Sequence, residues 1–167
     1  MDINSLKRRM LELDELAFSL YPECNFECVI VGGGALILLK VIPRATLDVD
    51  VLEVSKNLEE LFNVFDFNTR VQSLIYCFPY NYQDRLQKID IDTQVIKYYI
   101  PSLEDLIVSK LYAYRAKDVE DIENIIKSKK FNPKRLAEAV DDAKDSALNK
   151  QSYEEMVGLY HRHFGKE

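Results

Sequence analysis

The chain has 167 residues, of which 47% are hydrophobic and 30% charged, so it can build a core and is not expected to be disordered. With 22 Lys and Arg residues against 28 Asp and Glu residues, its net charge is −6, and the chain as a whole has no attraction for nucleic acid or an anionic membrane. Any phosphate site must therefore be local, and a divalent cation is the obvious way to build one.

The apolar runs and the cysteines indicate a cytoplasmic protein with no membrane contact. No run approaches the ~20 apolar residues that a membrane-spanning helix needs, and the first residues lack the apolar segment of a signal peptide. Cys24, Cys28 and Cys77 are an odd set, typical of free thiols in a reducing compartment. We expect no zinc site, because no second Cys or His pair lies at the spacing of a zinc finger.

The first half of the chain is predicted to form a small mixed α/β core. Apolar residues recur every three or four positions from Ser5 to Leu20, which is the spacing of an amphipathic helix. The run Cys28–Val31 predicts a buried strand, which Gly32-Gly33-Gly34 stops in a tight turn before a short buried helix over 35–42. β-branched content and alternation predict the next strand over 48–54.

The pattern is weaker between residues 57 and 100. Asn57 is expected to cap a helix that runs to about Phe65. Two further strands are expected over 71–78 and 94–100, because both segments are rich in β-branched and aromatic residues. The polar segment between these two strands has no clear period, and no element is predicted there.

From residue 101 onward the chain is predicted to be helical. Ser102 begins the first helix, and Asp105 three residues later makes a pattern similar to a capping box. Further helices are expected over 119–128, 133–146 and 153–164. We therefore predict an α+β fold, in which residues 1–100 form a mixed-sheet core with an N-terminal helix and residues 101–167 form a helical part packed on that core.

Asp48 and Asp50 are the first candidate functional residues, as possible metal ligands. Residues two apart on a strand point to the same side, about 6.6 Å apart along the chain, while Val49 and Val51 face the core. Neighbouring carboxylates repel each other, so the pattern favours a cation beside them. Mg²⁺ fits, because it binds one or two carboxylates together with substrate phosphates. The alternative is a solvated strand edge.

Gly32, Gly33 and Gly34 are the second candidate, because glycines before a helix let the backbone approach a ligand and point amides at it. The alternative is a tight strand-to-helix turn without a ligand. Three other motifs fail at specific positions. The dinucleotide fingerprint needs glycine where Ile37 stands, the EF-hand needs glycine where Glu53 stands, and the P-loop needs a Gly-Lys-Ser/Thr that is absent.

A strand, Gly-Gly, a short helix and then Arg44-Ala45-Thr46-Leu47-Asp48-Val49-Asp50 together resemble the nucleotidyltransferase fold shared with DNA polymerase beta. They are closest to small bacterial nucleotidyltransferase-like proteins related to the AbiEii abortive-infection toxins. In that superfamily the glycine turn holds nucleotide phosphates and the two aspartates bind catalytic Mg²⁺. The resemblance therefore implies phosphate contacts at Gly32–Gly34, metal ligation by Asp48 and Asp50, and cofactor contacts at Arg44 and Thr46.

The resemblance continues downstream. Residues 101–113 are similar to the family's "peDLi-x-x-Kl-x-A" helix, and residues 115–122 to its "R-x-K-D-x-x-D-I" segment. If 102–122 is roughly one helix, steps of about 100° place Lys110, Tyr114, Lys117 and Asp121 on one polar stripe. A solvated helix face is the alternative. The resemblance implies that Lys110 reaches a triphosphate, that Asp121 or Asp118 shapes the site, and that Lys117 lies near the nucleotide.

We therefore expect a nucleotidyltransferase that uses Mg²⁺ or Mn²⁺ and an NTP, and that moves NMP to a hydroxyl of RNA or protein. The resemblance adds a toxin–antitoxin or phage-defence role, with a cognate antitoxin as partner. A catalytically inactive binding protein on the same fold is the alternative, because no residue is clearly placed as the third carboxylate of active members; Asp84, Asp90 and Asp92 are the nearest. A purely structural α/β module is the weakest alternative.

Overall fold

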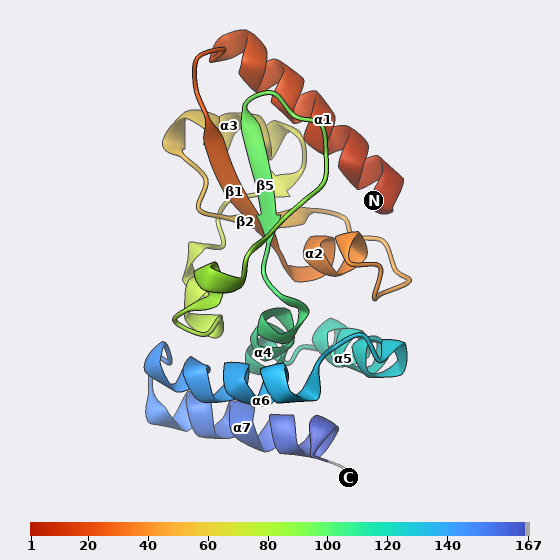
Figure 1. The fold of residues 1–167 in the computed structure, drawn as a ribbon, viewed down its shortest axis with the longest axis vertical. Helices are drawn as coiled ribbons and strands as arrows, with labels where there is room; N and C mark the ends of the chain where they lie inside the picture. Colours follow the sequence, from red (N-terminus) through yellow and green to blue (C-terminus); the bar gives the residue numbers. More distant parts are fainter. Residues whose placement is uncertain (166–167) are drawn as a thin grey trace. The chain divides into compact units, whose positions relative to one another are not determined.

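The computed structural model describes residues 1–165 (Figure 1) and has the predicted α+β fold. Three short 3₁₀ helices (η) lie among its α-helices and strands. In chain order the elements are α1 (Ile3–Leu20), β1 (Phe26–Val31), α2 (Gly32–Leu38), β2 (Val49–Leu52), α3 (Lys56–Val64), β3 (Phe67–Asn68), η1 (Gln72–Cys77), η2 (Tyr82–Arg85), β4 (Gln87–Lys88), β5 (Ile96–Ile100), α4 (Leu103–Ala113), α5 (Ala116–Ser128), α6 (Pro133–Asp142), η3 (Ala143–Asp145) and α7 (Lys150–Phe164).

The chain divides into two compact units. Unit 1 comprises Met1–Gln72 and Leu86–Pro101, and unit 2 comprises Ser73–Arg85 and the residues from Ser102 onward. The segment Ser73–Arg85, which lies within the 1–100 part of the predicted division, therefore belongs with the C-terminal helices. Each unit is described by itself below.

Unit 1 is built on a five-stranded mixed sheet in the order β3-β2-β1-β5-β4. The central strand β1 is antiparallel to β2 and parallel to β5. The short edge strand β3 is parallel to β2, and β4 is antiparallel to β5. Val29, Ile30 and Val31 are all buried, as expected for a strand with neighbours on both sides.

Helix α1 packs against the rest of unit 1 through the apolar face that the sequence predicts. Leu6, Met10, Leu13 and Ala17 are fully buried. Asp14 on the same face is also buried, and its carboxylate accepts hydrogen bonds from the backbone N–H groups of residues 94, 95 and 96 at 2.7–2.9 Å. These bonds satisfy a charge that would otherwise be costly to bury, and they join α1 to the start of β5.

Three local predictions between residues 35 and 78 were wrong. The strand expected over 71–78 is the 3₁₀ helix η1, because β3 already pairs with β2 and the side chain of Gln72 donates to the backbone carbonyl of Val51. The helix expected to be capped by Asn57 begins at Lys56 after Ser55. The short helix expected over 35–42 spans Gly32–Leu38, so it begins within the glycines.

Unit 2 is organised around α4, which contacts α5, α6 and α7. Leu106, Ile107 and Val108 of α4 are fully buried. At the helix start, the Ser102 hydroxyl accepts from the backbone N–H of Asp105 at 3.1 Å, as the sequence predicts. The buried Asp105 carboxylate is held by two hydrogen bonds from Arg85, of 2.8 and 2.9 Å, so residues 73–85 are fastened to the helices by a bidentate ion pair.

The single helix expected over 102–122 is wrong, because the chain bends at Tyr114. Tyr114 has a φ of +43°, a left-handed conformation that ends α4, and α5 begins at Ala116. Residues before and after this bend therefore do not lie on one continuous helix, and the polar stripe predicted from 100° steps does not extend across it.

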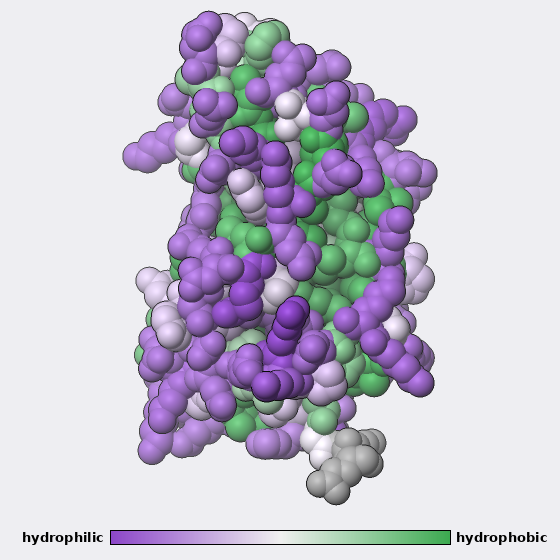
Figure 2. All heavy atoms as spheres, viewed as in Figure 1, coloured by the Kyte–Doolittle hydropathy of each residue, from purple (hydrophilic) through white to green (hydrophobic). Residues whose placement is uncertain are grey.

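Hydrophilic side chains predominate on the face of the molecule drawn in Figure 2, with apolar side chains between them. This agrees with a chain in which 30% of residues are charged. No helix among residues 1–165 is both long and apolar enough to cross a bilayer.

Candidate functional site

Gly32, Gly33 and Gly34 join β1 to α2, and a different neighbour crowds each of them. Gly32 has a φ of +63°, which glycine adopts without strain, and a Cβ there would lie 3.0 Å from Oδ2 of Asp50. A Cβ at Gly33 would lie 2.9 Å from Nη2 of Arg44, and one at Gly34 would lie 2.9 Å from Cγ1 of Val49. The glycines therefore let the backbone at the start of α2 approach the side chains of Arg44 and Asp50.

Arg44 and Thr46 lie in the segment that leads from α2 to β2. The guanidinium of Arg44 lies against Gly33. The Thr46 hydroxyl donates to the backbone carbonyl of Asp48 at 2.7 Å, and the Thr46 backbone N–H donates to the carbonyl of Met1 at 3.1 Å. Thr46 thus holds the backbone just ahead of the two aspartates, while Arg44 places a cationic group beside the glycine backbone.

Asp50 lies on β2, whereas Asp48 lies in the bend immediately before it, so the prediction that both lie on the strand holds only for Asp50. Val49 and Val51 are fully buried, as predicted. Asp48 is exposed and Asp50 is half-buried. The two carboxylates therefore lie at the start of a strand in which Val49 and Val51 are buried in the core.

Asn68 is a polar neighbour of Asp50 that sequence reasoning missed. It is the register partner of Asp50 on β3, and its Nδ2 donates to Oδ1 of Asp50 at 3.1 Å. The Oδ1 of Asn68 accepts from the backbone N–H of Arg70 at 3.1 Å, which orients the amide. A strand of two residues leaves no periodic signal, so nothing in the sequence marked this position. The later strand beside Asp50 thus carries an amide instead of a third carboxylate.

Asp48 and Asp50 fit a divalent cation that substrate oxygens help to bind. Mg²⁺ commonly binds through one or two carboxylates, with phosphates and water completing its six ligands. Because Gly32 has no Cβ, the space beside Oδ2 of Asp50 stays clear of a side chain. Within residues 1–165 no group of three or more His, Cys, Asp or Glu side chains is arranged to bind a metal. A cation here would therefore depend on oxygens from a substrate.

Lys110, Asp118 and Asp121 form a buried ion cluster in unit 2. The Nζ atom of Lys110 lies 2.9 Å from Oδ1 of Asp118 and 3.0 Å from Oδ2 of Asp121. The three side chains are exposed by only 6%, 1% and 0%, respectively. This cluster joins the last turn of α4 to the first turns of α5. Lys110 is therefore buried, and the alternative of a solvated helix face is wrong for this residue.

Arg115 completes the environment of Asp118. Its backbone N–H and its Nε both donate to Oδ2 of Asp118 at 2.9 Å. Burial acts to raise the pKa of Asp118, but the hydrogen bonds from Arg115 and Lys110 and the charge of Lys110 outweigh it, so the pKa lies below its ordinary value. Asp118 is therefore a stably ionised carboxylate that holds two cationic side chains.

The residues implied by the resemblance thus fall into two groups. Unit 1 brings Gly32 beside Asp50 and Gly33 beside Arg44, and Thr46 donates to the backbone carbonyl of Asp48, two residues before Asp50. Unit 2 brings together Lys110, Asp118 and Asp121, while Lys117 is exposed on α5. Of the candidates considered for a third carboxylate, Asp84, Asp90 and Asp92 are all exposed.

Comparison with known proteins gives one match, to a protein family. The family described as "Nucleotidyltransferase of unknown function (DUF6036)" matches residues 8–167, which is almost the whole chain and includes both groups of residues. No curated protein and no solved structure matches the chain.

Proposed function

The chain belongs to this nucleotidyltransferase family, and from that premise we propose that it transfers a nucleoside monophosphate from an NTP to a hydroxyl group, in a reaction that depends on a divalent cation. The observation that carries the proposal is the close approach of the Gly32 backbone to the Asp50 carboxylate. This approach places a backbone that can bind phosphate beside a carboxylate that can bind the cation of a metal–nucleotide complex.

The residues of unit 1 have distinct parts in this proposal. Asp48 and Asp50 bind the cation, and Asn68 holds Oδ1 of Asp50 in place. The Gly32–Gly34 backbone binds phosphate oxygens, and Arg44 adds a guanidinium, which pairs well with phosphate. When bound, Mg²⁺ or Mn²⁺ would neutralise triphosphate charge and polarise the α-phosphate. The protein would act mainly by positioning the substrates and balancing their charge.

The expected contact between Lys110 and the triphosphate remains a prediction, and its ion pairs limit how that contact can form. An ammonium group has three donors, and those of Lys110 already meet two carboxylates within 3.0 Å. One donor remains for a phosphate if both ion pairs are kept. We assign Asp118 and Asp121 the task of holding Lys110, and Lys117 a contact with the nucleotide from the exposed side of α5.

We further propose, on the resemblance to the AbiEii-type toxins, that the acceptor is an RNA or protein hydroxyl in the cytoplasm. The same resemblance supports a toxin–antitoxin or phage-defence role with a cognate antitoxin as partner. Incubation of the chain with α-labelled NTPs, Mg²⁺ and total cell RNA or protein tests this assignment. Label is expected in one acceptor class, with release of pyrophosphate. Label in neither class, from folded protein that binds nucleotide, would contradict it.

Thermal unfolding of the full chain tests the cation and nucleotide site directly. A ligand that binds only the folded state raises its stability, by about 2.7 kcal/mol at a hundredfold excess over Kd. Mg²⁺ and NTP together are expected to raise the Tm more than either alone. Asp48→Asn should abolish this gain. Asp92→Asn is the matched control, because Asp92 is an exposed member of a second segment of unit 1, 90–92, in which one apolar residue separates two aspartates.

A catalytically inactive binding protein on the same fold is the second candidate, and Asn68 favours it. The later strand beside Asp50 carries an amide in place of a carboxylate, and an amide brings no negative charge to a second cation. The two candidates differ in one outcome. A binding protein would gain stability from NTP without releasing pyrophosphate in the presence of any acceptor.

A further inference from the structure

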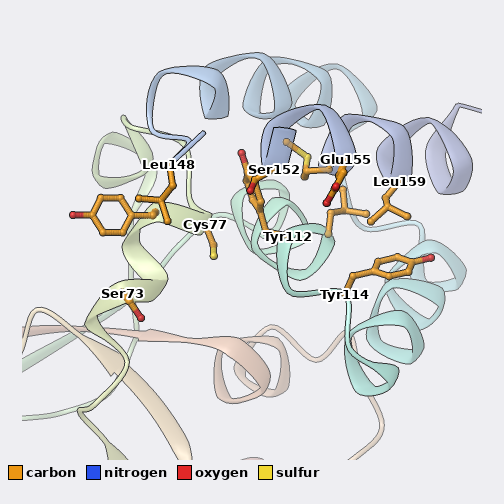
Figure 3. Close-up of a pocket in the computed structure, with 11 residues that line it drawn as sticks. Ser73, Cys77, Tyr112, Tyr114, Leu148, Ser152, Glu155 and Leu159 are labelled. Atoms are coloured by element: carbon orange, nitrogen blue, oxygen red, sulfur yellow. The ribbon is translucent and has the colours of Figure 1, made fainter. Parts of the chain in front are cut away.

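Unit 2 contains a cavity of about 470 Å³ that the proposed reaction does not use (Figure 3). Side chains from η1, α4, α7 and the segment before α7 line it, and all of them belong to unit 2. Its size lies within the range of about 300–1,000 Å³ that is typical of small-molecule sites. The cavity is therefore large enough for an organic ligand and is formed by one compact unit.

The walls of the cavity are mainly aromatic and aliphatic. Tyr76, Tyr112 and Tyr114 supply three rings, and three leucines and a methionine supply most of the remaining surface. The Tyr114 hydroxyl is hydrogen-bonded to Nε2 of His163 at 2.6 Å, which fixes its ring against the C-terminal end of α7. In Figure 3, Tyr112 extends from α4 and Tyr114 from the bend that follows this helix, and both lie beneath α7. The aromatic wall is thus formed before any ligand binds.

Among the lining residues that the structure describes, Glu155 is the only one that carries a formal charge at neutral pH, and none is basic. Burial, with smaller effects from Tyr153 and Cys77, raises the pKa of Tyr112 to about 12. Burial and the charge of Asp118 raise the pKa of the Cys77 thiol. Both groups therefore remain neutral. Gln151 donates to Oε1 of Glu155 at 3.1 Å and so helps to orient the carboxylate on α7.

We propose that this cavity binds a small organic cation with an apolar body, such as an arylalkylammonium ion. Aromatic ring faces attract a cation, and the carboxylate of Glu155 supplies the opposite charge. The leucines and the methionine accept the apolar body. Phosphates and other anions are disfavoured, because they would meet Glu155 without a compensating basic residue. The inference does not depend on nucleotidyl transfer.

Three probes that share a phenyl ring separate charge from shape. The probes are 2-phenylethylammonium, neutral 2-phenylethanol and anionic 3-phenylpropionate, each titrated into the full chain and followed by NMR chemical shifts. The cation is expected to bind about tenfold more tightly than the alcohol, the sum of a ring contact and an exposed ion pair. The anion should bind most weakly. Equal affinities for cation and alcohol, or tighter binding of the anion, would overturn the proposal.

A pair of neighbouring substitutions tests the role of Glu155. Glu155→Gln should weaken cation binding about threefold, which is the ion-pair part of the advantage, and leave alcohol affinity unchanged. Glu154→Gln is the matched control, because Glu154 is an adjacent exposed acid that pairs with Lys150 at 3.7 Å and does not line the cavity. If both substitutions weaken the cation equally, or neither does, the carboxylate of Glu155 is not the recognition group and the proposal fails.

A third variant locates the site without enlarging the cavity. Leu159 lines the cavity one helical turn after Glu155, so Leu159→Lys would place an ammonium group beside that carboxylate. Leu159 is half-buried, and thermal unfolding checks that the variant folds. It should lose binding of 2-phenylethylammonium, since its own cation occupies the site. Undiminished binding to this folded variant would place the probe elsewhere and overturn the proposal.

Discussion

Two pairs of aspartates in this chain have opposite surroundings. Asp48 and Asp50 lie at the start of β2, one exposed and one half-buried, beside the glycines that begin α2. Asp118 and Asp121 lie in the first turns of α5, almost wholly buried, with one lysine between them. The same type of side chain thus stays at least partly exposed to solvent in unit 1 and holds two helices together in unit 2.

The difference teaches that burial and partners decide the use of a carboxylate more than its spacing in the sequence does. An exposed acid costs little in the folded state and keeps its affinity for a cation. A buried acid is tolerated only with a close partner. Substitutions in unit 2 should therefore change stability, and those at Asp48 and Asp50 should change ligand binding.

The largest expected effect on stability is at Lys110. Lys110→Met leaves two buried carboxylates without their shared cation, and breaking such a pair costs about 3–5 kcal/mol. Urea unfolding followed by circular dichroism measures the loss. Lys117→Met is the control, because Lys117 is exposed on α5, and its change should stay within about 0.5 kcal/mol. Equal, small effects in both variants would mean that the cluster does not stabilise the fold.

Gly32 should show the next largest effect. Gly32→Ala places a Cβ at a φ of +63°, which costs roughly 1–2 kcal/mol, and brings it to 3.0 Å from the Asp50 carboxylate. Gly158→Ala is the matched control, because a Cβ there meets nothing within 4 Å and alanine favours the helix, so a gain of about 0.5–1 kcal/mol is expected. Thermal unfolding of the two variants should show shifts of opposite sign.

Asp50→Asn should separate stability from function. Asparagine keeps an oxygen that can accept from Asn68, so the free energy of unfolding should change by less than about 1 kcal/mol. The gain in Tm from Mg²⁺ with NTP, and any transfer of label, should both disappear, because asparagine lacks the negative charge that Asp50 offers to the cation. A larger loss of stability without ligand would show that the Asp50 charge itself supports the fold.

The smallest expected effect is the loss of folding stability when acid protonates Asp118. Its folded-state pKa is below the ordinary value of 3.8, so its contribution to stability is complete above pH 3.8 and is lost as the pH falls through the folded-state value. Urea unfolding at pH 6 and pH 3 measures this dependence. Asp118→Asn should reduce the difference in stability between the two pH values.

Local sequence patterns predicted most of the elements and the residues of the unit 1 site. The helix periodicity of α1, the Ser102 cap and the burial of Val49 and Val51 all follow from side chains that lie close together in the chain. The grouping of Gly32, Arg44 and Asp50 was reached through the resemblance, and the structure brings these residues into proximity. The roles assigned to them remain predictions.

Contacts between distant residues escaped prediction because they leave no local period. Asn68 meets Asp50 through a two-residue strand. Asp14 meets backbone N–H groups about eighty residues away. The segment η1 has strand-like composition but no strand with which to pair. In each case the outcome depends on which backbone groups are already occupied by other elements.

The sequence by itself determined the fold class, the pair of carboxylates near β2 and the family to which the chain belongs. Only the tertiary structure decided the environment of Lys110, because a left-handed residue at Tyr114 turns α5 back so that Asp118 and Asp121 face this lysine. Helical periodicity assumes an unbroken helix and places such a lysine on an exposed stripe. A single positive φ changes that geometry, and the cost of burying the charges then requires the ion pairs that the structure contains.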